Sequence, residues 1–351
     1  MGHRKTRPPI SAVDLFCGVG GLTHGLAMAG VRVTAGIDLD GTCRHPYEDN
    51  NAAVFLEGDV RDLAPGALRD LVGEGGPVLL AGCAPCQPFS TYSQAGRAGR
   101  DASDGQLLAS FGQLVCGLSP DLVAMENVPA VATQPVFEAF LRDLGGYHVS
   151  WSRVDCSLLG IPQTRKRLVL LASRLGPDGL TLQASGLPPP TVRETISGLM
   201  PLAAGETDPS DPLHSACNLS EMNLKRIRAS KPGGTWRDWD PSLRAACHSK
   251  STGENYASVY GRMEWDAPAP TVTTQCFGYG NGRFGHPEQD RAITLREAAL
   301  LQTFPPGYSF HRPGRRPGFS EVGRWIGNAV PVRLGEAIGR TLVAHAALYG
   351  R

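Results

Sequence analysis

The chain of 351 residues is 41% hydrophobic and 19% charged, a composition typical of globular proteins with room for two domains. No uncharged run approaches the ~18 residues that a membrane-spanning helix needs, and residues 1–9 are basic without the apolar core of a secretory signal. The nine cysteines have no disulfide-framework spacing, which favours a reducing compartment. A formal net charge of +1 identifies no partner, so a nucleic-acid surface would need a local cluster of positive charge.

The first half of the chain alternates short apolar runs with helical patterns. A predicted strand at residues 11–16 leads into the turn Cys17–Gly21, and a helix follows from Leu22 to Ala29 with Gly30 as its C-cap. Further strands are predicted at residues 31–37, 53–56, 77–81, 121–125, 149–154 and 167–172. This alternation predicts an α/β fold with a doubly wound parallel sheet, in which ligands bind beyond the carboxyl ends of the strands.

Glycines follow the first predicted strand, and acids end the next two. In the turn Cys17–Gly21 the glycines suggest a dinucleotide loop, but Thr23 stands where that fingerprint has its third glycine. The turn is therefore either a ligand loop or only a tight turn that needs positive φ. Asp38 lies roughly twenty residues after Asp14, where such folds place a ribose-binding carboxylate, and Asp59 could accept a hydrogen bond from an adenine amino group. We predict an adenosine pocket that is not built for a pyrophosphate.

The fourth predicted strand ends in Gly82–Cys86, a loop with two thiols and no charge. Cys86 is the candidate nucleophile. The fifth strand ends in Glu126, a carboxylate placed for acid–base chemistry; an exposed loop acid is the alternative. Arg165 and Arg167 are two residues apart and so share one face of an extended chain. A solvated face commonly explains such a pair, but here it enters a buried strand.

Residues 175–190 are rich in Gly and Pro and are predicted to be a linker. In the irregular region beyond it, residues 222–250 contain seven Lys or Arg and only two Asp, interleaved with Trp236 and Trp239. The cations are Lys225, Arg226, Arg228, Lys231, Arg237, Arg244 and Lys250. A solvated basic face is the default explanation, but in a loop-rich module phosphate contact is the better one.

Regular structure is predicted again near the C-terminus. Thr294 and Glu297 have the spacing of a capping box, which opens a helix, and a last helix runs from Val332 to about Leu348. The predicted buried face of the first helix is Leu295, Ala298, Ala299, Leu301 and Phe304. The predicted domain boundaries are 1–180 for the first domain and 181–285 for the second, with a return to the first domain at 286–351.

Six motifs occur in order along the chain. They are Asp14–Gly21, Ala84–Ser90, Glu126–Val128, Gln163–Arg167, Arg296–Glu297 and Gly327–Val330. In this order they resemble the motifs of DNA (cytosine-5)-methyltransferases of bacterial restriction–modification systems, from residue 11 to about residue 346. The resemblance implies a doubly wound, Rossmann-like sheet of the S-adenosylmethionine-dependent methyltransferases, with a second, smaller and irregular target-recognition domain. It makes residues 1–180 the catalytic and cofactor-binding domain, residues 181–285 the target-recognition domain, and residues 286–351 a return to the catalytic domain.

The resemblance also implies roles for individual residues. Cys86 looks like the nucleophile, and Glu126 is similar to the acid that holds the cytosine ring, with Arg165 beside it. The implied catalytic set is Cys86, Gln87, Glu126, Arg165 and Arg167. The implied S-adenosylmethionine contacts are Phe16, Gly18, Gly20, Gly21, Asp38, Leu39, Asp59, Val60, Pro85, Asn328 and Ala329. The implied DNA contacts are Ser90, Arg226, Arg228, Trp236, Arg237, Thr271 and Arg283, and no metal is expected.

Two positions depart from the family pattern. Leu39 stands where relatives often have an aromatic residue that stacks on adenine, which predicts weaker stacking on the cofactor. The loop after Ser90 has Asp101–Ser103 in place of the Asp-x-Arg spacing that is common in relatives.

The implied activity is methyl transfer from S-adenosylmethionine to carbon 5 of a cytosine flipped out of a specific duplex DNA sequence, through a covalent Cys86 adduct. The expected partners are double-stranded DNA and, where one exists, a cognate restriction endonuclease that acts on the same site. The protein is expected to be a monomer without membrane contact, in the cytoplasm of a bacterium and associated with its nucleoid.

Four alternatives remain open. The same chemistry could act on RNA, although the long recognition region favours duplex DNA. Cys83 and Cys86 could form a redox pair, but such sites belong to much smaller domains. A zinc site from both thiols with Cys43 and His45 lacks the usual ligand spacing. A non-catalytic DNA-binding regulator is disfavoured because the nucleophile and Glu126 are intact.

Overall fold

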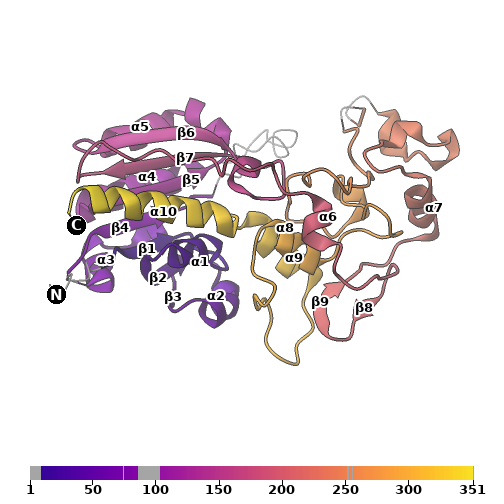
Figure 1. The fold of residues 1–351 in the computed structure, drawn as a ribbon, viewed down its shortest axis with the longest axis horizontal. Coiled ribbons are helices and arrows are strands. Elements are labelled where there is room, and N and C mark those ends of the chain that lie inside the picture. The colour runs from indigo at the N-terminus through magenta and orange to yellow at the C-terminus, as the bar shows by residue number, and fades with distance from the viewer. Residues whose placement is uncertain (1–8, 74, 86–102, 251–252, 255, 351) are drawn as a thin grey trace. The chain divides into compact units, whose positions relative to one another are not determined.

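The computed structural model describes residues 9–73, 75–85, 103–250, 253–254 and 256–350, and Figure 1 shows its fold. The chain divides into two compact units. Unit 1 takes the described parts of Met1–Leu159, Lys166–Ser185 and Val330–Arg351, and unit 2 takes those of Gly160–Arg165 and Gly186–Ala329. Within the described ranges no helix is long and apolar enough to cross a membrane.

Unit 1 is built on a seven-stranded sheet with the strand order β3-β2-β1-β4-β5-β7-β6. The strands are β1 (Ser11–Leu15), β2 (Arg32–Asp38), β3 (Val54–Glu57), β4 (Val78–Gly82), β5 (Leu122–Asn127), β6 (His148–Asp155) and β7 (Lys166–Ser173). β1 to β5 pair in parallel. All residues of β1 and β5 are buried, and strands covered on both faces have the continuous apolar runs seen in this sequence. The predicted α/β fold is confirmed.

β7 differs from the predicted parallel arrangement. It pairs antiparallel with both β5 and β6. Only residues 156–165 join β6 to β7, which is shorter than the dozen or more residues of a parallel crossover. The pairing also lengthens β5, because Glu126 and Asn127 lie opposite Val169 and Leu168. The strand therefore ends later than the sequence predicts, and Glu126 belongs to it.

Helices cover both faces of the sheet. Unit 1 contains α1 (Gly21–Met28), α2 (Arg44–Asn50), α3 (Pro65–Val72), α4 (Ser103–Leu118), α5 (Pro135–Asp143) and α10 (Val332–Leu348). Val13 and Leu15 of β1 share a core with residues of α3, α4 and α5. Asp14 between them bonds to Thr23 of α1 instead. Since successive strand side chains point to opposite faces, α1 lies on the face opposite to α3, α4 and α5.

The C-terminal helix α10 packs against α1 through glycines. A Cβ added at Gly25 would lie 2.2 Å from the carbonyl oxygen of Val332, and one added at Gly339 would lie 2.6 Å from the Cβ of Ala29. The two backbones come this close because no side chain separates them. Helix α10 also has the bounds that the sequence predicts.

Unit 2 contains little regular structure. Its elements are α6 (Val192–Ile196), β8 (Thr207–Asp208), β9 (Asp211–Ser215), α7 (Glu221–Ala229), α8 (Leu295–Leu301) and α9 (Phe319–Asn328). The sequence assigns residues 286–329 to the catalytic domain, whereas here they lie in unit 2. Packing explains the difference, because α8 contacts α6, β9 and α9 of the same unit.

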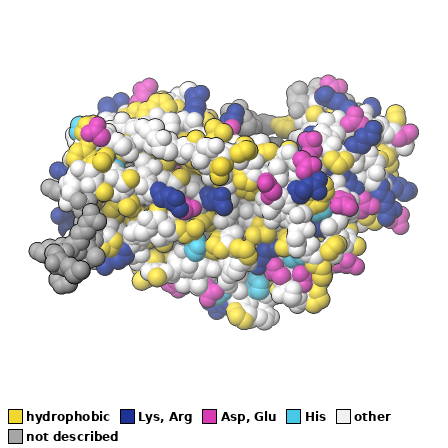
Figure 2. Space-filling model, viewed as in Figure 1, with side chains coloured by type: hydrophobic (Ala, Val, Ile, Leu, Met, Phe, Trp, Pro, Cys, Tyr) yellow, Lys and Arg dark blue, Asp and Glu magenta, His cyan; other side chains and the backbone are white. Residues whose placement is uncertain are grey.

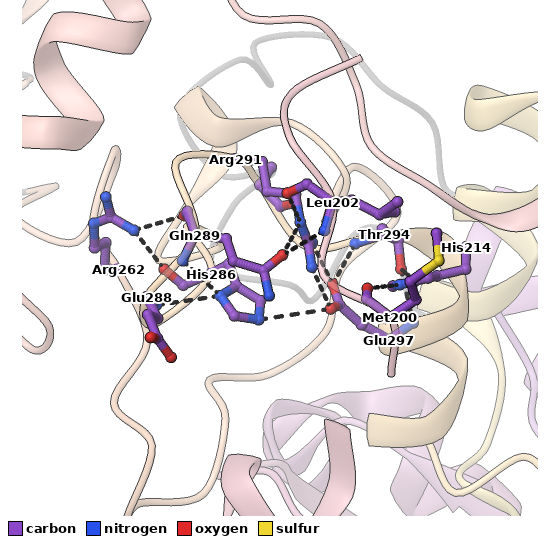
Figure 3. Close-up of polar contacts among 11 residues, drawn as sticks. Met200, Leu202, His214, Arg262, His286, Glu288, Gln289, Arg291, Thr294 and Glu297 are labelled. Atoms are coloured by element: carbon purple, nitrogen blue, oxygen red, sulfur yellow. Dashed lines mark hydrogen bonds and ion pairs between the residues drawn. The ribbon is translucent and has the colours of Figure 1, made fainter. Parts of the chain in front are cut away.

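Figure 3 shows the buried polar network that joins distant segments of unit 2. Arg291 donates to both carboxylate oxygens of Glu297 at 2.8 Å, and both side chains are 1% exposed. Burial opposes ionisation of Glu297, but the hydrogen bonds from Arg291 hold its pKa below the usual value. Burial also lowers the pKa of the neighbouring His286 to about 4, so His286 is neutral at physiological pH.

The same glutamate begins helix α8. The Glu297 amide donates to Thr294 Oγ1 at 3.1 Å, and the Thr294 amide donates to Glu297 Oε2 at 2.7 Å. The predicted capping box is confirmed. The predicted apolar residues are all buried, with Leu295, Ala298, Ala299 and Leu301 on the helix and Phe304 beyond its end.

Candidate active site

The turn after β1 reaches the end of β2. Gly18 and Gly20 have φ of 51° and 90°, in the left-handed region that glycine enters without steric cost; Gly21 then begins α1. The Gly18 amide donates to Asp38 Oδ2 at 2.8 Å. Phe16, with φ of 59°, packs half-buried against the core of the sheet. The glycine turn and the predicted ribose carboxylate therefore lie together.

Asp38 is fixed from a second side. Its Oδ1 accepts a hydrogen bond from the Asp40 amide at 2.9 Å, and its backbone carbonyl accepts one from the Gly58 amide at 3.0 Å. Leu39 is 67% exposed, so its aliphatic side chain is open to a ligand. The ends of β2 and β3 are thus joined at the predicted cofactor edge.

Asp59 has a partner that the sequence did not predict. Its carboxylate accepts from the backbone amide of Arg61 at 2.9 Å and from Arg61 Nε at 2.9 Å and 3.0 Å. These hydrogen bonds lower the pKa of Asp59, which keeps the group an ionised acceptor at neutral pH. Val60 next to it is 3% exposed and anchors the turn in the core.

Thr23 replaces the missing third glycine for a structural reason. Its hydroxyl donates to Asp14 Oδ2 at 2.7 Å and lies 3.1 Å from the hydroxyl of Tyr47. Asp14 is 1% exposed, and burial raises its pKa to about 7. Asp14 Oδ1 has no hydrogen-bond partner among the described residues. In the sequence, the sign of this buried pair is Asp14, an acid inside an otherwise apolar predicted strand.

Glu126 lies on β5, beside the end of β4. Its side chain is 3% exposed, and Oε1 lies 2.8 Å from Nε of Arg167. Oε2 accepts a hydrogen bond from Cys83 Sγ at 2.6 Å. A buried carboxylate is costly unless it is paired and hydrogen-bonded, and both conditions are met here. The burial excludes the alternative of an exposed loop acid.

The residues that directly follow β4 are held in place by β5. Gly82 pairs with Met125, and Asn127 Nδ2 donates to the carbonyl oxygen of Ala84 at 3.1 Å. Pro85 is exposed and is the last described residue before 103. Three predicted site residues lie outside the described residues, namely Cys86, Gln87 and Ser90.

Arg165 and Arg167 belong to different units, although the sequence predicts that they share one face. Arg165 is 3% exposed and donates to the carbonyl oxygens of Val272 at 3.0 Å and Gly327 at 3.3 Å. Arg167 stands at the start of β7 and pairs with Glu126. The ion-pair partner of Glu126 is therefore Arg167, whereas the sequence-based hypothesis gave that place to Arg165.

Arg165 also supports the turn with two predicted cofactor contacts. It donates to the carbonyl oxygen of Ala329 at 3.5 Å, and Asn328 is exposed at the end of α9. A Cβ added at Gly327 would lie 2.3 Å from the Thr274 amide nitrogen, so only glycine fits there. Arg165 thus holds backbone within unit 2.

Thr271 lies on a segment that is tied to the Gln163–Arg167 motif. Its hydroxyl donates to the carbonyl oxygen of Thr164 at 3.1 Å, and the Thr164 amide donates to Ala269 at 2.8 Å. Gln163 Nε2 donates to the carbonyl oxygen of Leu301 at 2.8 Å. These contacts give Thr271 a defined place in unit 2.

Lys and Arg side chains gather over the part of unit 2 around α7, with Asp and Glu among them, as Figure 2 shows. Arg228 is 66% exposed and lies 3.1 Å from Asp290. Arg237 is exposed and donates to a backbone carbonyl. Arg226 and Arg283 are half-buried and donate to backbone carbonyls at 2.7 Å. The predicted DNA contacts therefore differ in how much of each charge reaches solvent.

Trp236 is only 4% exposed, which corrects its predicted direct contact with DNA. Its ring stacks on His248 with 4.2 Å between centroids and 9° between planes. The guanidinium carbons of Arg237 and Arg244 lie 5.5 Å and 5.9 Å from its centroid, within reach of a cation–π interaction. A buried indole offers little surface to a base or phosphate, but it supports the two arginines.

Among the described residues, no group of three or more His, Cys, Asp and Glu side chains could hold a metal ion. Cys43, His45 and Cys83 of the zinc alternative belong to these residues, whereas Cys86 lies outside them.

The comparisons with known proteins agree with the order of the motifs. A family model described as C-5 cytosine-specific DNA methylase matches residues 10–344. The chain is 49% identical over 344 residues to Type II methylase M.HgiDII of Herpetosiphon aurantiacus, covering 95% of this chain and 94% of that relative. It is 29% identical over 345 residues to Type II methyltransferase M.Eco47II of Escherichia coli, covering 95% of this chain and 78% of that relative.

Solved structures share the fold. A putative DNA modification methyltransferase encoded within an Escherichia coli prophage matches with a TM-score of 0.73 at 22% identity, covering 95% of this chain and 99% of that one. A DNMT2 mutant of Spodoptera frugiperda matches with a TM-score of 0.65 at 16% identity, covering 97% and 99%. At these identities the likeness establishes the fold alone.

Proposed function

The chain belongs to the C-5 cytosine-specific DNA methylase family, and we propose that it acts through a covalent adduct between Cys86 and a cytosine flipped out of a specific duplex DNA sequence. The reaction transfers a methyl group to carbon 5 of that cytosine. The single observation that carries the proposal is the buried Glu126 carboxyl, which pairs with Arg167 and lies beside the end of β4. Cys86 follows the end of that strand by four residues in the sequence.

S-adenosylmethionine, the methyl donor of this family, supplies a methyl group on a positively charged sulfur. The residues at the ends of β1, β2 and β3 fit its adenosine part. Asp38, held by the Gly18 amide, presents a carboxylate to the ribose hydroxyls, and Asp59 presents one to the adenine amino group. Phe16 and the exposed Leu39 offer apolar contact to the adenine ring.

Carbon 5 of cytosine is too weak a nucleophile to attack a sulfonium methyl group unaided. In the proposed reaction the Cys86 thiolate adds to carbon 6, and the electron pair of the 5,6 double bond becomes available at carbon 5. Carbon 5 then takes the methyl group and loses its proton to water or a base. Loss of that proton re-forms the double bond and releases the Cys86 thiolate.

Glu126 acts on the opposite side of the ring in this proposal. A proton held at its carboxyl hydrogen-bonds ring nitrogen 3, where negative charge develops during the attack. When the proton moves to the base, the resulting carboxylate is paired by the Arg167 guanidinium, 2.8 Å away, and nitrogen 3 returns the proton to Glu126 when the thiolate leaves. Arg167 is thus the proposed partner of Glu126, and Arg165 is proposed to position the turn of Asn328 and Ala329.

DNA binding is proposed for the basic segment at residues 222–250. Flipping a base out of the duplex costs a few kcal/mol, and phosphate contacts by Lys and Arg contribute to holding the opened duplex. Arg237 and Arg244 are proposed to make such contacts while the buried Trp236 ring fixes their direction. We also propose that the protein is a monomer in the bacterial cytoplasm and acts on the same DNA site as a cognate restriction endonuclease.

The test replaces Cys86 by serine. With tritium-labelled S-adenosylmethionine and unmethylated plasmid DNA, we expect Cys86→Ser to abolish methyl transfer while cofactor affinity changes less than about twofold, because the thiolate is the attacking group. Turnover near that of the wild type would sink the assignment. A parallel arm with total tRNA distinguishes the RNA alternative, since a DNA methyltransferase transfers label to the plasmid and not to the tRNA.

A further inference from the structure

Each carboxylate oxygen of Glu126 has its own partner. Oε1 lies 2.8 Å from Arg167 Nε, and Oε2 accepts a hydrogen bond from the thiol of Cys83 at 2.6 Å. The proposed reaction uses Arg167 and Cys86 but gives Cys83 no part. We propose that Cys83 is a positioning residue, whose thiol fixes the orientation of the Glu126 carboxyl group toward the target base.

The sheet fixes Cys83 in this place. It follows the last residue of β4, and Gly82 lies opposite Met125 of β5, so Cys83 comes level with Glu126. The Cys83 amide donates to Leu15 of β1 at 3.4 Å, and the next residue, Ala84, accepts from Asn127 at 3.1 Å. The backbone around the thiol is therefore held by both neighbouring strands.

A second contact matters because of how a glutamate side chain rotates. The terminal torsion of Glu is broad and roughly two-fold, so one contact from Arg167 at Oε1 leaves the plane of the carboxyl group free to turn. A donor at Oε2 removes that freedom. The rate of methyl transfer depends strongly on how precisely a proton donor is placed. Cofactor binding at the ends of β1, β2 and β3 does not depend on that placement.

The thiol is suited to donating here rather than attacking. A thiol donates a hydrogen bond only through its own proton, and the contact with Glu126 Oε2 uses that proton in a weak hydrogen bond. Loss of such a bond is expected to cost about tenfold in rate, equivalent to ~1.4 kcal/mol.

The inference rests on the role proposed for Glu126, so the experiment includes both residues. Methyl transfer from labelled S-adenosylmethionine to plasmid DNA is measured for the wild type, Cys83→Ala, Cys83→Ser, Glu126→Gln and the double variant Cys83→Ala with Glu126→Gln. Cys116→Ala is the matched control, because Cys116 is exposed on α4 and its thiol donates to a backbone carbonyl.

We expect Cys83→Ala to lower kcat about tenfold with KM for the cofactor within about twofold, and Cys83→Ser to return kcat to within about threefold of the wild type. In the Glu126→Gln background Cys83→Ala should have no further effect, because a residue that acts through Glu126 loses its role with it. Cys116→Ala should match the wild type.

Three outcomes would overturn the inference. They are an unchanged kcat in Cys83→Ala, a Cys83→Ser variant as slow as Cys83→Ala, and additive losses in the double variant. Failure of the proposed function has a different signature, since then the wild type transfers no label to DNA or Glu126→Gln is as active as the wild type.

Discussion

The carboxyl edge of the unit 1 sheet and the basic segment of unit 2 hold their polar side chains by different means. At the sheet edge, Asp38 and Glu126 stand at strand ends, and their partners lie on a neighbouring strand or directly after one. In the basic segment, Arg226 is tied down by a carbonyl and by aromatic rings that come from separate loops. Register alone fixes the first group, whereas the second depends on long-range contacts that no local pattern shows.

This difference predicts that single substitutions are severe at the sheet edge and mild in the basic segment. In the proposed function one carboxyl at the edge serves one reacting base. In the basic segment the proposal has seven cations share the binding of a polyanion, so each contributes a fraction of the affinity.

The largest effect is expected at Glu126. Glu126→Gln keeps the size of the side chain but removes its transferable proton, and kcat for methyl transfer should fall by about a thousandfold. The assay is single-turnover transfer of labelled methyl groups to plasmid DNA. Glu138→Gln is the control, because Glu138 is exposed on α5. If kcat falls less than about tenfold in Glu126→Gln, the Glu126 carboxyl at the sheet edge takes no part in the chemistry.

The second prediction concerns the packing that supports the sheet. Gly25→Ala would place a Cβ 2.2 Å from the carbonyl oxygen of Val332, and forcing α1 from α10 should lower the free energy of unfolding by ~2–3 kcal/mol. Gly66→Ala in α3 is the matched control, since a Cβ there meets nothing within 4 Å, and it should stabilise by ~0.5–1 kcal/mol. Urea unfolding measures both, and equal midpoints would contradict the close helix contact.

The third prediction follows from Asp14. Burial raises its pKa from 3.8 to about 7, so the folded state holds the proton to a higher pH than the unfolded chain does. The contribution of Asp14 to stability is therefore lost as pH rises from about 4 to about 7. Between pH 5 and pH 7 the wild type should lose ~1–2 kcal/mol of unfolding free energy relative to Asp14→Asn, measured by urea titration without cofactor. Parallel curves for the two proteins would show that Asp14 is ionised when buried.

The smallest effect is expected in the basic segment. Arg237→Ala removes one of several proposed phosphate contacts, so affinity for duplex DNA should fall about threefold and the slope of log K against log salt should shrink by about one. Arg193→Ala is the control, because Arg193 is an exposed arginine of unit 2 that pairs with Asp266. A hundredfold loss in Arg237→Ala would mean that the segment reads bases through this side chain, and the contrast between the two regions would fail.

The same contrast explains how far the sequence could predict the molecule. The strands of unit 1 and its helices α1 and α10 follow from periodicity, because each buries a regular face. The antiparallel β7 was not predicted, since an apolar run has the same pattern in either direction. Without that pairing the extension of β5 through Glu126 could not be anticipated.

Individual partners in the site were harder to predict than its elements. The spacing of Arg165 and Arg167 does not show which of them pairs with Glu126. The path of the chain decides it, because Arg165 belongs to unit 2 whereas Arg167 lies on β7 and pairs with Glu126. Trp236 is predicted to contact DNA only because it lies among the cations of residues 222–250. Its burial depends on His248 and on residues much later in the chain, which local composition does not reveal.

Covalent attack by Cys86 is tested most directly with duplex DNA in which every cytosine is replaced by 5-fluorocytosine. Fluorine at carbon 5 cannot leave as a proton does, so the adduct formed after methyl transfer cannot collapse. With S-adenosylmethionine present, the wild type should give a protein–DNA complex that resists SDS, and peptide mass spectrometry should place the link on Cys86. Cys86→Ser should give none. Methylation of ordinary DNA by the wild type without any trapped complex, or a link to another residue, would contradict the mechanism.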